Sequence, residues 1–270
     1  MCCDAPRVAG MSTGSCCSQG LGYELLNVVR DDYLRALHGF VVVVQLGTGV
    51  ALWFVTDRDA VVPLYVHWPG PRGNGAAWKE APSQHLGSFP VGLLAPVFLW
   101  MNALQHALTL AFYSIYQSNL EKRQNWFRWL EYAFSASLMH VMVALLCGIF
   151  DIHLLFLIAA LTAITMYFGH LEEQVHRGFL VGFLPWAAQW MVIACFFFRS
   201  IQHAEHSVPT FVYWIYFIEL ILDMVFPFAS QYFLHANKDN FIKGEYVFVI
   251  ASFTAKQALA WINWGGTRSL

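Results

Sequence analysis

Long apolar stretches separated by short polar segments are the dominant pattern along this 270-residue chain. A helix needs about 20 mostly apolar residues to cross the hydrocarbon core of a membrane. Seven stretches meet that length: 33–55, 90–116, 127–149, 152–171, 178–199, 210–234 and 244–264. Most connections between them are short, which is typical of neighbouring antiparallel helices. The pattern therefore predicts an all-α, multi-pass membrane protein with seven spanning helices.

Two segments depart from this pattern. Residues 1–29 show no apolar periodicity, so we expect a disordered tail before a membrane domain at 30–270. The first connection, 57–89, is long, and it contains VVPLYVHW followed by the turn-rich PGPRGNG. Alternating β-formers beside Pro and Gly favour a strand or hairpin over an irregular loop.

Composition supports a membrane location and argues against a soluble globule. Hydrophobic residues make up 58% of the chain and charged residues 12%, with a mean hydropathy of +0.50. Soluble domains are about 45–50% apolar and about 25% charged. The net charge of −2 provides no electrostatic attraction for nucleic acid. The expected surroundings are therefore a lipid bilayer.

Lys and Arg in the connections predict the orientation, because positive loops stay in the cytoplasm. One side holds nine: Arg7, Arg30, Arg35, Lys122, Arg123, Arg128, Arg177, Lys238 and Lys243. The other side holds five: Arg58, Arg72, Lys79, Arg199 and Arg268. This asymmetry predicts a cytoplasmic N-terminus and, after seven spans, an extracellular or lumenal C-terminus. We expect Arg128 to remain at the membrane interface.

The most informative residue is Lys256, which lies inside the last apolar stretch, VFVIASFTAKQALAWINW. About eleven helical residues precede it there, or about 16 Å, which places the amine near mid-membrane. One interpretation is a structural ion pair with Glu131 of the third stretch. The other is covalent use of the amine, because a desolvated lysine forms Schiff bases readily and a protonated Schiff base needs a carboxylate counterion. Glu131 fits that role, and Ser252 lies one turn before Lys256.

Three segments carry a resemblance to a known family. The segment FRWLEYAFSASLM at 127–139 resembles the third helix of heliorhodopsins, and ASFTAKQALAW at 251–261 resembles their seventh helix, which carries the retinal-linked lysine. The segment NALQHALTL at 102–110 is similar to their second helix, with its pocket histidine. The resemblance implies a seven-helix rhodopsin-like bundle with a β ribbon in the first long loop. It also implies a homodimer with the N-terminus inside.

The same resemblance implies a chromophore site. All-trans retinal would be bound to Lys256 as a protonated Schiff base, with Glu131 as its counterion. The polar region near the Schiff base would contain His38, Asn102, His106 and Ser252. The polyene and ring would be held by Tyr132, Met139, Met166, Trp186 and Trp261.

Two further carboxylates suggest transport. Glu219 and Asp223 are four residues apart in the sixth stretch and share one helix face. Intramembrane carboxylates serve as proton stations in pumps and channels. We therefore expect light-dependent proton movement through Glu131 and Glu219, with Asp223 as a second candidate. The alternative reading of Glu219 and Asp223 is a buried, protonated pair.

Other functions remain open at this point. A photosensor without transport, signalling through a separate partner, is the main alternative. A membrane metalloenzyme would need about three converging ligands. The eleven histidines are scattered, and the seventh stretch contains none. The sequence therefore predicts no metal site and no enzymatic activity.

Overall fold

The computed structural model describes residues 16–68, 83–175, 178–203, 208–234 and 238–268. The chain divides into two compact units, Met1–Leu37 and His38–Leu270, and the second holds the helical bundle. The elements are α1 (Cys16–Val55), β1 (Val61–His67), β2 (Ser83–Pro90), a 3-10 helix (Val91–Leu93), α2 (Leu94–Ala111), α3 (Tyr113–Glu121), α4 (Trp126–Leu146), α5 (Ile152–Val175), α6 (Phe179–His203), α7 (Thr210–Leu234) and α8 (Lys238–Thr267).

Six helical segments in the described ranges are both long and apolar enough to cross a membrane. They are Asp32–Val55, Val91–Ala111, Trp126–Leu146, Ile152–Val175, Phe179–His203 and Thr210–Phe233. The seventh predicted stretch, 244–264, lies inside α8, which has 30 residues and packs against α7 and α2. Its apolar character is diluted by charged residues, Glu245 and Lys256 among them. The predicted helical membrane fold is confirmed.

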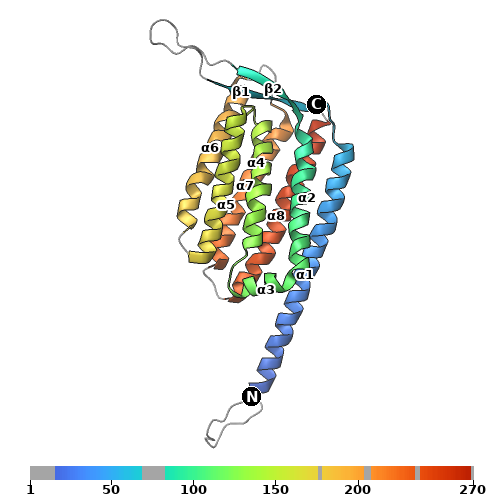
Figure 1. Cartoon of the computed structure of the whole chain (residues 1–270), viewed down its shortest axis with the longest axis vertical. Helices are drawn as coiled ribbons and strands as arrows, with labels where there is room; N and C mark the ends of the chain where they lie inside the picture. The colour runs from blue at the N-terminus through green and yellow to red at the C-terminus, as the bar shows by residue number, and fades with distance from the viewer. Residues whose placement is uncertain (1–15, 69–82, 176–177, 204–207, 235–237, 269–270) are drawn as a thin grey trace, which may run out of the picture. The chain divides into compact units, whose positions relative to one another are not determined.

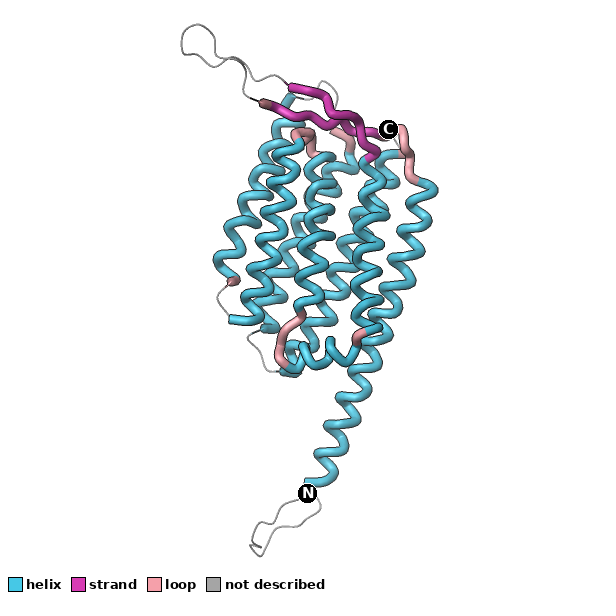
Figure 2. Tube along the Cα trace, viewed as in Figure 1, coloured by secondary structure: helices cyan, strands magenta, loops and turns pink. Residues whose placement is uncertain are grey.

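Within the bundle unit, the two ends differ in structure. The β1–β2 ribbon lies across one end, which we call the ribbon end, and α3 lies at the opposite end, which we call the α3 end (Figures 1 and 2). The predicted stretch 90–116 is not one helix, because the chain turns at Phe112 (φ −109°, ψ 39°) between α2 and α3. The short helix α3, YSIYQSNLE, is mostly polar, which fits a position at the end of a span.

The tail prediction differs from the structure in part. Residues 16–29, expected to be disordered, belong to α1, which begins at Cys16. The sequence of this segment includes Leu25 and Leu26, and leucine has a high helix propensity. Residues 1–15 of the predicted tail lie outside the described residues.

The predicted hairpin is present as an antiparallel ribbon. Val61 pairs with Pro90 and His67 with Ser83, and the register shifts between Leu64 and Tyr65. Gly87 lies opposite this shift with φ +151°, a conformation that favours glycine. The ribbon is attached to the bundle where the amide of Tyr65 donates to the carbonyl of Phe150, at 2.9 Å. The connection 69–82 lies outside the described residues.

Asp151 connects the ribbon to the start of α5. Its carboxylate pairs with His67 of β1, and its Oδ1 accepts hydrogen bonds from the amides of His153 (2.9 Å) and Leu154 (3.1 Å). It is thus an N-cap for α5. Burial acts to raise the pKa of Asp151, but the bonds from His67 and the two amides outweigh it and hold the pKa below its ordinary value.

This arrangement predicts an acid-sensitive attachment. A lowered carboxyl pKa contributes stability that is present above the ordinary value and lost as the pH falls through the lowered value. Asp151→Ala should reduce stability by about 1 kcal/mol near neutral pH, because the cap and the ion pair are both lost. Asp151→Asn, which keeps a capping oxygen, is the control and should cost less. Thermal unfolding followed by circular dichroism measures both. Equal losses for the two variants would contradict the capping role.

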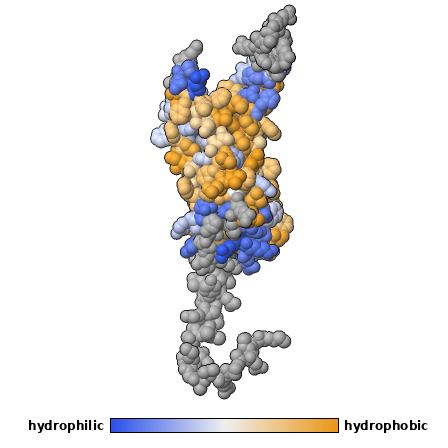
Figure 3. Space-filling view, turned by 90° about the vertical axis from the view of Figure 1, so that its left-hand side faces the viewer, coloured by the Kyte–Doolittle hydropathy of each residue, from blue (hydrophilic) through white to orange (hydrophobic). Residues whose placement is uncertain are grey.

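The surface of the bundle is apolar around its middle. In Figure 3 a hydrophobic band is bounded on both sides by hydrophilic residues, as expected where lipid surrounds the helices. Exposed large side chains include Phe156, Leu180 and Leu184, at 70% exposure or more. The interior combines an apolar core, containing Phe98, Met142 and Phe197, with buried polar groups on α2, α4, α7 and α8. Those polar groups define the candidate site.

Candidate functional site

Lys256 lies deep in α8, with 2% of its surface exposed. Its Nζ donates a 2.7 Å hydrogen bond to Oγ of Ser252, one helical turn earlier. The same nitrogen lies 3.5 Å from Oε1 of Glu131 on α4 and 5.1 Å from the ring centre of Tyr132. The structure therefore brings together the amine, the carboxylate and the hydroxyl that the sequence analysis assigned to one site.

Glu131 is buried beside this amine. Neither of its carboxylate oxygens has a hydrogen-bond partner within the part of the chain that the structure describes. A buried carboxylate without hydrogen bonds is costly unless a positive charge compensates it. Lys256 provides that charge. The remaining acceptor capacity of Glu131 suits a cationic group formed at Nζ.

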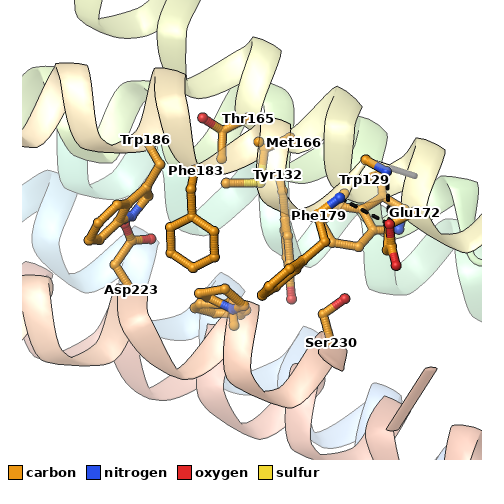
Figure 4. Close-up of a pocket in the computed structure, with 15 residues that line it drawn as sticks. Trp129, Tyr132, Thr165, Met166, Glu172, Phe179, Phe183, Trp186, Asp223 and Ser230 are labelled. Atoms are coloured by element: carbon orange, nitrogen blue, oxygen red, sulfur yellow. Dashed lines mark hydrogen bonds between the residues drawn. The ribbon is translucent and has the colours of Figure 1, made fainter. Parts of the chain in front are cut away.

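A cavity adjoins the amine between α4, α5, α7 and α8. Tyr132, Met139 and Met166 line it, together with Ser252 and Lys256. A second cavity continues between α4, α5, α6 and α7 (Figure 4). The two cavities share four lining residues: Tyr132, Met166, Asp223 and Phe226. They therefore form adjoining parts of one apolar space that begins at Nζ of Lys256.

Aromatic side chains from α4, α6 and α7 line the second cavity. Figure 4 shows the ring of Phe183 between Trp186 and Tyr132, and the Phe183 and Trp186 rings lie 5.7 Å apart in an edge-to-face arrangement. On α5, a Cβ added to Gly169 would lie only 2.3 Å from the Trp129 ring. Because Gly169 has no side chain, the Trp129 ring packs directly against the α5 backbone.

Four of the five predicted pocket residues line this space, and Trp261 does not. Trp261 is 42% exposed and donates a 2.9 Å hydrogen bond to Gln257. It follows Lys256 by five residues, which rotates it roughly 140° around the helix. The prediction for Trp261 does not match its place in the structure, because a position five residues on is on another face of α8.

Asp223 and Glu219 both line the first cavity, but their partners differ. Oδ2 of Asp223 accepts hydrogen bonds from the indoles of Trp186 (2.5 Å) and Trp190 (2.8 Å), and it lies 3.5 Å from Nε2 of His140. Oε1 of Glu219 is buried without a hydrogen-bond partner in the described residues. Asp223 is thus anchored, whereas Glu219 retains a free acceptor.

The predicted histidines form a separate polar group. Nδ1 of His38 lies 2.5 Å from Nδ1 of His106, and Nε2 of His38 lies 3.3 Å from the hydroxyl of Tyr116. Asn102 accepts a 3.2 Å hydrogen bond from Gln45, which in turn accepts one from Gln257 at 3.0 Å. The histidines and Tyr116 thus form one hydrogen-bonded set, and Asn102, Gln45 and Gln257 form another.

Arg128 lies near the start of α4, at the α3 end of the bundle, and does not pair with Glu131. It is 4% exposed and forms ion pairs with Glu173 of α5 and Glu245 of α8. Asn125, the N-cap of α4, donates its backbone amide to Glu173 and its side-chain amide to Glu245, each at 2.8 Å. The guanidinium stays inside because two carboxylates satisfy it there.

Comparison with known proteins agrees with this geometry. A family model described as Heliorhodopsin matches residues 34–268. The chain belongs to the heliorhodopsin family. No curated protein sequence matches it significantly.

Solved structures support the fold of this heliorhodopsin. The Exiguobacterium sibiricum rhodopsin is 14% identical, with a TM-score of 0.61, over 88% of this chain and 96% of that one. Xanthorhodopsin, a light-driven ion pump with dual chromophore, is 11% identical, with a TM-score of 0.58, over 89% and 94% of the two chains. At these identities the likeness establishes the shared fold alone.

Family membership implies a retinal-containing, light-sensing membrane protein, and the residues present fit that group. A buried amine opens onto an apolar space walled by aromatic rings, which suits a conjugated aldehyde. The unfilled acceptors of Glu131 suit the positive charge that such an adduct carries. The close approach of Trp129 to Gly169 provides a flat wall for a rod-shaped ligand.

Four residues of this heliorhodopsin were missed as site members: Tyr116, Arg128, Glu173 and Glu245. Their polar groups lie near the ends of apolar stretches, where sequence patterns alone place polar groups in water. One signal was available in the sequence, because Arg128 lies three residues before Glu131 and the two side chains therefore share one helix face. Its partners come from α5 and α8, and no local spacing shows that they converge.

Proposed function

We propose that this protein binds retinal covalently at Nζ of Lys256, with Glu131 as counterion, and moves protons across the membrane under light. When bound, retinal supplies light absorption and an isomerisation that disturbs the geometry at Nζ. The observation that carries the proposal is the 3.5 Å pair of Lys256 and Glu131 inside the bundle. Ser252 orients the nitrogen through its 2.7 Å contact.

The predicted site residues other than Trp261 have roles in this proposal. Tyr132, Met139, Met166 and Trp186 hold the chromophore in the apolar space. Asp223 fixes the Trp186 and Trp190 indoles. The polar region contains His38 of α1 together with Asn102 and His106 of α2. We propose all-trans retinal in the protonated state, because Glu131 balances a positive nitrogen.

Glu219 is the proposed proton station toward the ribbon end. It is buried with a free acceptor oxygen, and it borders the same cavity as Lys256. Counted along α7, it lies nine residues from Thr210 at that end, or about 14 Å. Intramembrane carboxylates are costly, and most serve ion pathways. With a cytoplasmic N-terminus, as the loop charges predict, the ribbon end faces outward.

Photocurrents test the transport step. Cells that express the protein should show light-dependent current at zero voltage that changes with the pH on either side. Glu219→Gln should reduce it roughly tenfold, because the station can no longer exchange a proton. Asp223→Asn, at the anchored carboxylate four residues on, is the comparison variant. The visible spectrum of each variant serves as the folding control.

Two results would count against this assignment. Full current in Glu219→Gln would exclude Glu219 from the path. A wild type that absorbs visible light but carries no current would exclude transport and favour a photosensor that signals through a separate partner. Homodimers, as the family resemblance implies, can be checked on the same preparation by light scattering.

A further inference from the structure

A continuous series of hydrogen bonds runs from His106 to the α3 end and includes no residue of the Glu219 route. His106 and His38 are joined at 2.5 Å, His38 and Tyr116 at 3.3 Å, and the Tyr116 hydroxyl donates to Oε2 of Glu245 at 3.2 Å. All four side chains are 3% exposed or less. Every member can both accept and release a proton.

This series reaches from the amine region to the helix ends. Glu245 precedes Lys256 by eleven residues on α8, which is about 16 Å along the axis toward the α3 end. His106 lines a small cavity whose wall includes Tyr132, and Tyr132 also lines the cavity beside Lys256. Glu245, at the other end of the series, contacts Asn125, the residue before α4. The four groups therefore connect mid-bundle with the boundary of the helices.

A small cavity accompanies the series. His38, His106, Tyr132, Arg128 and Glu245 line it. Tyr132 also lines the cavity beside Lys256, so its ring is a wall common to both spaces. The amine and the histidine pair are therefore on two sides of one aromatic side chain.

The end of the series has an excess of acid. Arg128 supplies one positive charge, and Glu173 and Glu245 supply two carboxylates. Two ionised carboxylates and one guanidinium would leave a net negative charge in a buried site, which is unfavourable. The Tyr116 hydroxyl donates to Glu245, so a proton carried along the series arrives at that carboxylate, while Arg128 keeps its pair with Glu173. The cluster is therefore able to store one proton without leaving the guanidinium unpaired.

We propose that His106, His38, Tyr116 and Glu245 form the α3-side half of the proton path, with Glu245 as its terminal carboxylate. The proposal rests on the proposed light-dependent proton movement and supplies the side of the path that Glu219 does not serve. If these residues only stabilised the fold, the ion pairs of Arg128 would be sufficient. Hydrogen bonds that connect the histidine pair and Tyr116 to those ion pairs would not be required.

Each transfer in this path is balanced. At the start, Nδ1 of His106 and Nε2 of His38 each carry the ring proton. In the proposed path a proton released from the Lys256 nitrogen enters at Nε2 of His106, and the proton on Nδ1 of His106 passes to Nδ1 of His38. The proton on Nε2 of His38 passes to the Tyr116 oxygen, and the Tyr116 hydroxyl proton passes to Oε2 of Glu245. Both histidines end neutral in the opposite tautomer, Tyr116 is unchanged, and Glu245 has gained one proton.

Tyr116→Phe is the decisive variant, because it removes one hydroxyl and keeps the ring that packs edge-to-face on His38 at 5.3 Å. Tyr113→Phe is the matched control on the same helix, with a ring 5.7 Å from Tyr116. Photocurrent should fall roughly tenfold in Tyr116→Phe and stay at the wild-type level in Tyr113→Phe. The dark visible spectrum should be the same in both.

Infrared difference spectroscopy separates this proposal from the transport proposal. Light-minus-dark spectra of the wild type should show a newly protonated carboxyl group. This band should be absent in Glu245→Gln and strongly reduced in Tyr116→Phe. If the carboxyl band changes as expected in both variants but the wild type carries no current, the relay is supported as an internal proton transfer and the transport proposal is refuted. If current flows and both variants leave current and band unchanged, the relay is overturned and transport stands.

Discussion

Lys256→Ala is expected to give a protein that stays colourless when all-trans retinal is added, whereas the wild type gains a visible band. The reason is that Nζ of Lys256 is the buried amine that opens onto the aromatic cavity and lies beside a carboxylate. Lys243→Ala, which removes an exposed lysine from the same helix, should keep the full band. Absorption spectra of purified protein decide the result.

The variant must also be shown to fold. Removing one partner of a buried ion pair costs about 3–5 kcal/mol, because the other charge stays behind. Lys256→Ala combined with Glu131→Gln removes both charges and should restore stability without restoring colour. A visible band in either protein that lacks Lys256 would refute covalent attachment at this residue and, with it, the proposed chromophore site.

The second large effect is expected at Glu131. In Glu131→Gln the cationic nitrogen loses the only carboxylate that the described residues place within 4 Å. At an effective dielectric constant of about 20, one charge at this distance is worth roughly 5 kcal/mol. Visible absorbance at neutral pH should therefore fall by more than about half, a near-ultraviolet band should replace it, and acid should restore it.

Glu131→Asp is the matched control, because it keeps the negative charge and shortens the side chain by one methylene. It should keep most of the visible absorbance at neutral pH. A spectral titration of both variants measures the difference. Unchanged absorbance in Glu131→Gln would show that another group is the counterion, and Glu219, at the same cavity, would be examined next.

Several features of this protein could be predicted from local patterns. The apolar stretches located the spans to within a few residues, because membrane burial demands continuous apolar surface. The Pro- and Gly-flanked β-formers predicted the ribbon. Lys256 and Glu131 stood out because each is a charge inside an apolar stretch, and buried opposite charges require one another. Ser252 followed from helical periodicity alone.

Other features depended on contacts between distant segments. The break at Phe112 turns the polar end of a predicted span into α3, and that turn brings Tyr116 to His38 and Glu245. Trp261 was assigned to the chromophore by family resemblance, yet its face of α8 points elsewhere. Neither outcome is visible in hydropathy, which reports depth in the membrane but not rotation about the helix axis.

The amino-acid pattern thus established the membrane fold, the ribbon and the charged pair, since each follows from burial and periodicity along one segment. The tertiary structure decided which acid each base meets. Arg128 is three residues from Glu131, within reach along one helix, but it pairs with Glu173 and Glu245 from α5 and α8. The rotation of each helix and its position along the bundle select those partners. A salt bridge requires atoms within a few ångströms, and the spacing of residues along the chain does not determine which side chains of different helices come that close.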